Sequence, residues 1–126
     1  MKKENKKITE LVKTFEDARK LTGRPDVPDF SNLPTDMRKH FEAQYKMIVI
    51  AEALNEGWIP DWDNYNEYKY YPWFEMSPSS FAFGVSYYDY ATADAGSGSR
   101  LKFRTHELAE YAAKQFIDIW KDIQIA

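Results

Sequence analysis

The 126-residue chain contains no cysteine and only two histidines. Without cysteine it can form no disulfide, no zinc–thiolate site and no thiol nucleophile. Its longest uninterrupted apolar run, Met47 to Ala51, is five residues, whereas a helix needs about 20 to cross a bilayer. No apolar stretch follows the basic N-terminus, so the sequence does not resemble a secretory signal. We therefore expect a cytoplasmic protein with no membrane partner and no cofactor.

Aromatic residues, in contrast, are abundant and unevenly placed. They make up 17% of the chain, and 13 of the 21 lie between Trp58 and Tyr90. The net charge of −3 is also uneven: it is +4 over residues 1–24, −8 over residues 25–99 and +1 over residues 100–126. The aromatic region is thus the acidic region, which argues against a polyanion as its direct partner.

Apolar residues at helical spacing predict two N-terminal helices and one C-terminal helix. The first is expected over residues 5–21 and the second over residues 35–55, ending at Gly57. The linker between them is rich in proline. The third helix is expected to begin after Thr105 as N-cap. The second helix is expected to bury one face, formed by Met37, Phe41, Tyr45, Ile48, Ala51 and Leu54.

The apolar period changes to two in "YKYYPWFEM", "SFAFGVSYYDY" and "RLKFR". This alternation predicts a three-stranded antiparallel meander, with Pro72 at an edge or beside a bulge. The residues expected to point inward are Phe81, Phe83, Leu101 and Phe103. The predicted fold class is α+β, with the C-terminal helix packed on the sheet. We expect a single domain over residues 1–126, with a helical half (1–56) and a βββα half (57–126).

The midsection holds more rings than a small sheet needs for its core. The excess consists of tryptophan and tyrosine, which combine an apolar body with a polar group and are common at interfaces. An interaction surface for a protein partner or for self-association is therefore one interpretation; it comprises Trp58, Trp62, Tyr65, Tyr68, Tyr71 and Tyr88. The other interpretation is that the long loop folds its own rings back over the sheet.

A nucleic-acid partner is the alternative function. Single-strand binders combine stacking rings with a basic groove. Arg100, Lys102 and Arg104 would share the outer face of the third strand and could contact phosphates beside Tyr88. An ordinary charged solvent face that discourages edge pairing explains the same pattern.

Three further patterns have some features of chemical sites. "DWDNYNEY" begins like a calcium loop at Asp61 and Asp63, but it lacks the central glycine and the final glutamate. His40 and His106 have no evident catalytic partner, so we expect packing or solvated side chains. Glu75 and Asp89 are the one carboxylate pair that could meet across the hairpin as glycosidase acids do. We expect no metal site and no catalytic residue.

The second half of the chain resembles a known group of proteins. "GWIPDWDNYNEYKYYPWF" and "GSRLKFRTHELAEYAAKQFIDIWKD" are the stretches that carry the likeness. They resemble uncharacterised small proteins of gut Bacteroidota and of their phages and mobile elements, over Gly57 to about Asp122. The resemblance implies a phage or mobile-element context and carries over no catalytic residue. Together these patterns predict a non-enzymatic interaction module.

Overall fold

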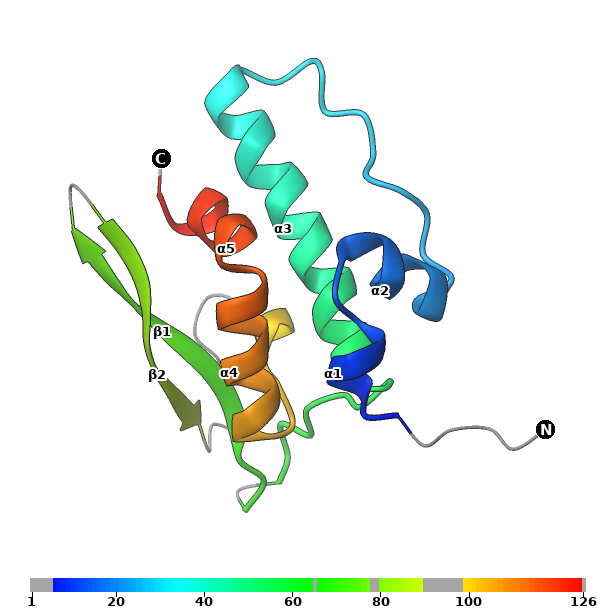
Figure 1. Cartoon of the computed structure of the whole chain (residues 1–126), viewed down its shortest axis with the longest axis vertical. Helices are drawn as coiled ribbons and strands as arrows, with labels where there is room; N and C mark the ends of the chain where they lie inside the picture. The colour runs from blue at the N-terminus through cyan, green and yellow to red at the C-terminus, as the bar shows by residue number, and fades with distance from the viewer. Residues whose placement is uncertain (1–5, 65, 78–79, 90–98, 126) are drawn as a thin grey trace.

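The computed structural model describes residues 6–64, 66–77, 80–89 and 99–125 (Figure 1). These residues form an α+β fold of helices and one antiparallel hairpin, as the sequence predicts at this coarse level. In chain order the elements are α1 (Ile8–Leu11), α2 (Phe15–Thr22), α3 (Thr35–Leu54), β1 (Lys69–Ser77), β2 (Ser80–Asp89), the 3₁₀ turn η1 (Ser99–Leu101), α4 (His106–Gln115) and α5 (Ile117–Gln124).

The elements form successive layers. The hairpin lies at one side, α4 and α5 pack against it, α3 lies behind them, and α1 and α2 cover α3 from the other side (Figure 1). The expected contact between the C-terminal helical segment and the sheet is therefore confirmed. Among the described residues, no helix has both the length and the apolar character needed to span a membrane.

Over the residues that the structure describes, the sheet has two strands and not the three of the predicted meander. The expected third strand is reduced to η1 and one bridge, in which Phe103 and Tyr70 exchange hydrogen bonds of 3.0 and 2.8 Å. Tyr70 also pairs with Tyr88 of β2. The Phe103 segment thus lies beside β1, on the edge opposite β2, so that β1 and not β2 is central at this end. Leu101 and Phe103 are nevertheless buried, as predicted.

Pro72 occupies a position in β1 where its missing N–H is harmless. Tyr70 directs both backbone groups toward Phe103, and alternation directs those of Pro72 the same way, away from β2. A register shift follows at once between Trp73 and Phe74, which leaves Gly84 of β2 as the extra residue. Of the two alternatives predicted for Pro72, an edge or a bulge, the bulge is present, with its extra residue on β2. Alternation along β1 directs Trp73 outward and Phe74 inward against Trp120, at a ring distance of 5.3 Å.

The first predicted helix is broken in two, at Lys13 and Thr14. Thr14 caps α2 by accepting a 3.1 Å bond from the Asp17 N–H, and the Asp17 carboxylate accepts the N–H groups of Lys13 and Thr14. These bonds depress the pKa of Asp17, with the bond from Lys13 contributing most. Two carbonyls at the break accept side-chain hydrogen bonds from α4: the Tyr111 hydroxyl donates to Val12 and the Gln115 amide donates to Lys13.

The third predicted helix is also divided, at Phe116, whose φ of −115° and ψ of 35° are not helical. The Trp120 indole N–H donates to the Ala112 carbonyl at 3.1 Å, and the same carbonyl also accepts the Phe116 backbone N–H. The turn lets α5 pack on α3 while α4 packs on the hairpin. Two helical segments can therefore serve two layers where one straight helix could serve only one.

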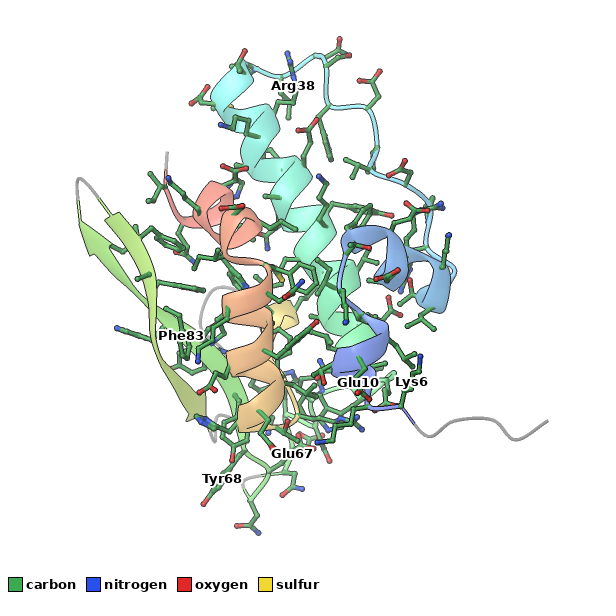
Figure 2. The ribbon with its side chains drawn as sticks, in the orientation of Figure 1. Lys6, Glu10, Arg38, Glu67, Tyr68 and Phe83 are labelled. Atoms are coloured by element: carbon green, nitrogen blue, oxygen red, sulfur yellow. The ribbon has the colours of Figure 1, made fainter. Side chains whose placement is uncertain are left out.

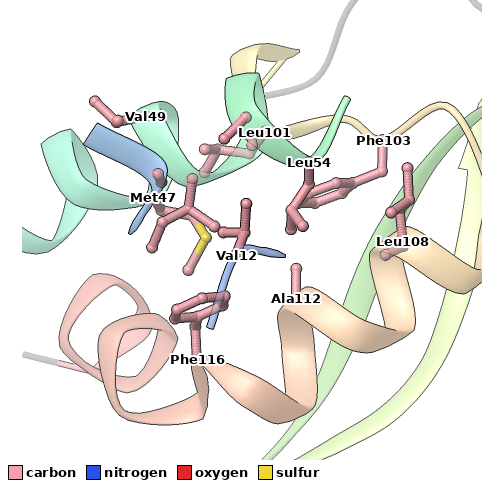
Figure 3. Close-up of a cluster of buried hydrophobic side chains, with 14 of the residues drawn as sticks. Val12, Met47, Val49, Leu54, Leu101, Phe103, Leu108, Ala112 and Phe116 are labelled. Atoms are coloured by element: carbon pink, nitrogen blue, oxygen red, sulfur yellow. The ribbon is translucent and has the colours of Figure 1, made fainter. Parts of the chain in front are cut away.

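The core lies where these layers meet (Figure 3). Met47, Leu54, Phe103 and Phe116 are buried around Val12, which α1 inserts from the far side. The predicted central position of "MIVIA" is confirmed, since Met47, Val49, Ile50 and Ala51 are all buried. The small residues of α4, Ala109, Ala112 and Ala113, are fully buried and allow close approach to its neighbours.

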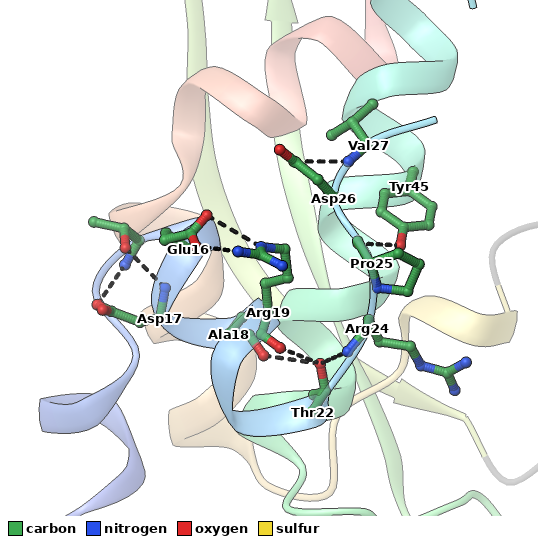
Figure 4. Close-up of polar contacts among 11 residues, drawn as sticks. Glu16, Asp17, Ala18, Arg19, Thr22, Arg24, Pro25, Asp26, Val27 and Tyr45 are labelled. Carbon is green, nitrogen blue, oxygen red and sulfur yellow. Dashed lines mark hydrogen bonds and ion pairs between the residues drawn. The ribbon is translucent and has the colours of Figure 1, made fainter. Parts of the chain in front are cut away.

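The predicted apolar face of α3 is only half right. Ala51 and Leu54 are buried, but Met37 and Phe41 remain largely exposed. The N-terminal end of α3 extends past the other layers (Figure 1). The linker contacts it there through Phe30, whose ring lies 6.0 Å from that of Phe41. The linker is fastened further along by Tyr45, whose hydroxyl donates to the Pro25 carbonyl at 2.5 Å (Figure 4).

Candidate functional site

The most informative hollow lies beside the C-terminal half of α3, between the loop of residues 57–62 and η1. It encloses about 330 Å³. We call it the tryptophan groove because two indoles help to line it. The lining residues are Arg24, Ile48, Glu52, Asn55, Gly57, Trp58, Ile59, Pro60, Trp62, Arg100 and Lys102. The groove thus unites rings and basic residues that the sequence placed in two separate sites.

One wall of the groove begins where α3 ends. Asn55 closes the helix, and Gly57 adopts a φ of 83°, in the region that glycine tolerates best. The Trp58 N–H then donates to the Asn55 carbonyl at 2.9 Å. This tight reversal fixes Trp58 directly against the helix, and the predicted stop at Gly57 is confirmed.

A buried ion pair organises the rest of this loop. The Lys69 side chain is 0% exposed, and its Nζ lies 3.3 Å from Glu67 Oε1. Nζ also donates to the carbonyls of Asn64 and Glu67, at 3.3 and 3.2 Å. A lysine is almost never buried unless it is paired. The loop is therefore wrapped around this ammonium group, below the start of α4, where Figure 2 labels Glu67.

The same pair positions both indoles. Glu67 accepts the Trp58 indole N–H at 3.2 Å and the Asp61 backbone N–H at 2.7 Å. Lys69 Nζ lies 5.2 Å from the centre of the Trp62 ring, within range of a cation–π contact. No residue in the described part of the chain accepts a hydrogen bond from the Trp62 indole N–H. Both rings are half-buried and held in place before any ligand arrives.

The three cations of the groove differ in their partners. Arg24 forms a two-pronged pair with Glu52, at 2.8 and 3.1 Å, and this bond raises the pKa of Arg24. Lys102 is 5% exposed, and its Nζ lies 3.8 Å from the centre of the Tyr71 ring. Arg100 is exposed, and no described residue forms an ion pair with it. Arg100 is therefore the cation that can turn toward a ligand.

The floor of the groove is supported by Asn55, which is 4% exposed. Its amide N–H donates to the Lys102 carbonyl at 2.8 Å, and its amide oxygen accepts the Arg104 N–H at 3.0 Å. The side chain thus ties the end of α3 to the segment after η1. The amide group of Asn55 therefore has a structural role at this end of the groove.

The predicted interaction surface is brought together only in part. Trp58 and Trp62 share the groove, Tyr71 meets it through Lys102, and Tyr68 is 41% exposed at the end of the loop. Tyr65 lies outside the described residues, and only the backbone pairing of Tyr88 with Tyr70 is described. Trp73, which is 55% exposed, was not among the predicted residues. Residues three apart on a strand face opposite sides, so an inward Tyr70 indicates that Trp73 points outward.

The predicted basic face is dispersed, because residues 99–105 form a 3₁₀ turn and one bridge and not the strand that would align it. Arg100 lines the groove, Lys102 is buried against Tyr71, and Arg104 pairs with Glu56. The buried Lys69 was not predicted as part of any site. The sequence did contain a signal for it: Lys69 is a single basic residue between two tryptophans in an acidic region, where many carboxylates and rings could pair with it.

The other patterns find structural explanations. The Asp61 carboxylate accepts the Asp63 N–H at 3.0 Å, as in an ordinary turn. No cluster of three or more metal-binding side chains is present among the described residues. His40 Nδ1 donates to the Ile123 carbonyl at 3.1 Å, and the exposed His106 lies 3.8 Å from Glu110. Both are consistent with the packing and solvated roles expected.

Glu75 and Asp89 are too far apart to act as a glycosidase pair. Asp89 pairs with Lys69, and Glu75 lies six residues further along β1. At about 3.3 Å per residue the separation is about 20 Å, whereas glycosidase carboxylates lie about 5–9.5 Å apart. The hairpin register therefore removes this candidate.

Comparison of the chain with family models, with curated proteins and with solved structures gives no match. The geometry of the tryptophan groove is therefore the basis for assigning a function.

Proposed function

We propose that this protein is a non-enzymatic interaction module that holds a partner protein in the tryptophan groove. The observation that carries the proposal is the meeting of two half-buried indoles, the 80%-exposed Ile59 and the exposed Arg100 in one hollow. Tryptophan and arginine are the residues most enriched among those that dominate binding energy at interfaces. An exposed isoleucine beside them supplies apolar area that water does not favour.

The rigidity of the groove supports this proposal. Ordering a loop on binding subtracts from affinity. Here the buried Glu67–Lys69 pair and the bond to the Trp58 indole already hold the loop. A partner would then meet preformed walls. The phage or mobile-element context belongs to the same proposal, and it rests on the sequence resemblance alone.

A peptide-library selection tests the function while the partner is still unidentified. Random peptides are displayed, selected on the wild-type protein and counter-selected on Ile59→Glu. Ile59 is 80% exposed, so the substitution should leave the fold intact while placing a carboxylate at the mouth of the groove. We expect an enriched motif that Ile59→Glu and Trp62→Ala lose.

Trp73→Ala is the matched control, because Trp73 is an exposed tryptophan on the hairpin outside the groove lining. It should retain the motif. Circular dichroism of each variant establishes that loss of binding is not loss of folding. If no motif depends on the groove, or if light scattering shows that the groove residues instead mediate a dimer, the proposed partner protein is refuted.

Single-stranded nucleic acid is the second candidate, favoured by the placement of Arg100 beside two stacking rings. It is weakened by the engagement of Lys102 with Tyr71 and of Arg104 with Glu56. Nucleic-acid binding depends strongly on salt. Failure of a thymidine oligonucleotide to bind at low salt would remove this candidate.

A further inference from the structure

The charge balance of the tryptophan groove indicates the chemistry of its ligand; the inference rests on the function proposed above. The chain as a whole is acidic, with a net charge of −3, yet the groove lining contains three cations and one carboxylate. Arg24 already neutralises that carboxylate, Glu52, in a two-pronged pair. Arg100 is then the lining cation without an ion pair among the described residues, which favours an anionic ligand.

The donors that lack a protein partner narrow the class of anion. Arg100 has no ion pair, and the Trp62 indole N–H has no acceptor, among the residues that the structure describes. A guanidinium presents a planar fork of donors that matches a carboxylate. Arg24 and Lys102 are engaged within the protein. One carboxylate therefore suits the groove better than a chain of phosphates, which needs several cations.

The walls add a second requirement, an apolar flat group. Trp58, Trp62 and Ile59 contribute aromatic and aliphatic side chains to this lining. The enclosed 330 Å³ is at the small end of ligand pockets, about 300–1,000 Å³. It suits one aromatic side chain with its neighbours and is too small for a folded surface.

We infer that the tryptophan groove binds a short peptide segment of the partner in which an aromatic residue adjoins an aspartate or glutamate. The ring packs between the two indoles and Ile59, and Arg100 donates to the carboxylate. The buried Lys69 does not contact this ligand. It positions Trp62 from the opposite side of the ring.

An NMR titration of the full chain with blocked tripeptides tests this inference. The probe is Asp-Phe-Asp, and its controls are Asn-Phe-Asn, which lacks the charge, and Asp-Ala-Asp, which lacks the ring. We expect the indole N–H signals of Trp58 and Trp62 and the Arg100 side-chain signal to shift with the probe. The Trp120 indole N–H, which is bound to Ala112 in the core, should not move.

Arg100→Gln should weaken binding of Asp-Phe-Asp about tenfold, as expected when a charge-assisted pair is lost, and should abolish its preference over Asn-Phe-Asn. Arg104→Gln is the matched control, since Arg104 pairs with Glu56 and does not line the groove. It should bind as the wild type does. Unchanged binding by Arg100→Gln, equal binding of Asn-Phe-Asn, or tighter binding of a thymidine oligonucleotide would each overturn the inference.

The outcome is separable from that of the proposed function. A library motif that depends on the groove but contains no acidic residue would refute the acidic–aromatic ligand and leave the interaction module intact. Absence of any groove-dependent motif would refute both.

Discussion

Replacement of Glu67 by glutamine tests whether one buried ion pair holds the groove together. The substitution keeps the shape of the side chain but removes its charge. Three groups lose their partner or meet a poorer one: Lys69 Nζ, the Trp58 indole N–H and the Asp61 backbone N–H. An amide has one acceptor oxygen, and its NH₂ group would face donors.

The magnitude follows from the burial of the pair. Removing one partner of a buried ion pair costs about 3–5 kcal/mol. The Lys69 side chain is 0% exposed but that of Glu67 is 22% exposed, so water can compensate in part. We expect Glu67→Gln to lower the free energy of unfolding by about 2–3 kcal/mol, measured by urea denaturation.

Asp63→Asn is the matched control, because it makes the same change of charge in the same loop at an exposed side chain. It should change the free energy of unfolding by less than about 0.5 kcal/mol. Lys69→Met combined with Glu67→Gln should cost less than the sum of the two single changes. If Glu67→Gln behaves like Asp63→Asn and hydrogen exchange at Asp61 is unchanged, the pair does not organise the loop.

Four further predictions follow from hydrogen bonds at the other junctions. Asn55→Ala leaves one buried and one part-buried backbone group unpaired and should cost about 2–4 kcal/mol in urea denaturation; a smaller loss than for Thr14→Ala would contradict that role. Thr14→Ala removes the cap of α2 and should cost about 1 kcal/mol. Because the pKa of Asp17 lies below its ordinary 3.8, the stability that Asp17→Asn removes should be present above that pH and vanish as the pH falls below it; a difference that persists at pH 2 would be inconsistent with this. Burial raises the pKa of the Tyr111 phenol above 10.0, so its contribution should be complete below pH 10 and decline as the pH rises further, and the stabilities of the wild type and Tyr111→Phe should converge in alkaline solution.

Periodic patterns of apolar residues in the sequence predicted correctly which residues are buried in the middle of an element. The central "MIVIA" of α3 and the inward Leu101 and Phe103 were predicted correctly because their spacing alone reports which face is apolar. The exposure of Met37 and Phe41 was not predicted, because the spacing of apolar residues does not show where the neighbouring layers end.

The two helix breaks differ in how far the sequence could reveal them. Thr14 followed three residues later by Asp17 is a readable capping signal, overlooked because the apolar stripe continues across it. The break at Phe116 has no such signal. It depends on Trp120 reaching back to Ala112 and on the need to contact both the hairpin and α3.

The pairing of Phe103 with β1 could not be predicted, because nothing local distinguishes one strand edge from the other. The candidate site shows the same division. Trp58, Trp62 and Arg100 were recognised by residue type, but for two separate functions. Their meeting in one groove depends on Asn55 and Lys69. Asn55 bonds to Lys102, which is distant in sequence, and Lys69 bonds to a carbonyl in the irregular loop, so neither contact could be predicted from local patterns.

The bonds from Tyr111 and Gln115 to the carbonyls of Val12 and Lys13 join positions 99 and 102 residues apart. A ribosome releases the N-terminal segment first, yet the acceptors on that segment gain these donors only when α4 has emerged. Val12 must likewise wait for Phe116 before its apolar contacts are complete. Residues of the α1–α2 junction are therefore made well before the donors that complete their contacts, and a nascent chain halted before α4 would keep this junction open to water and to chaperones.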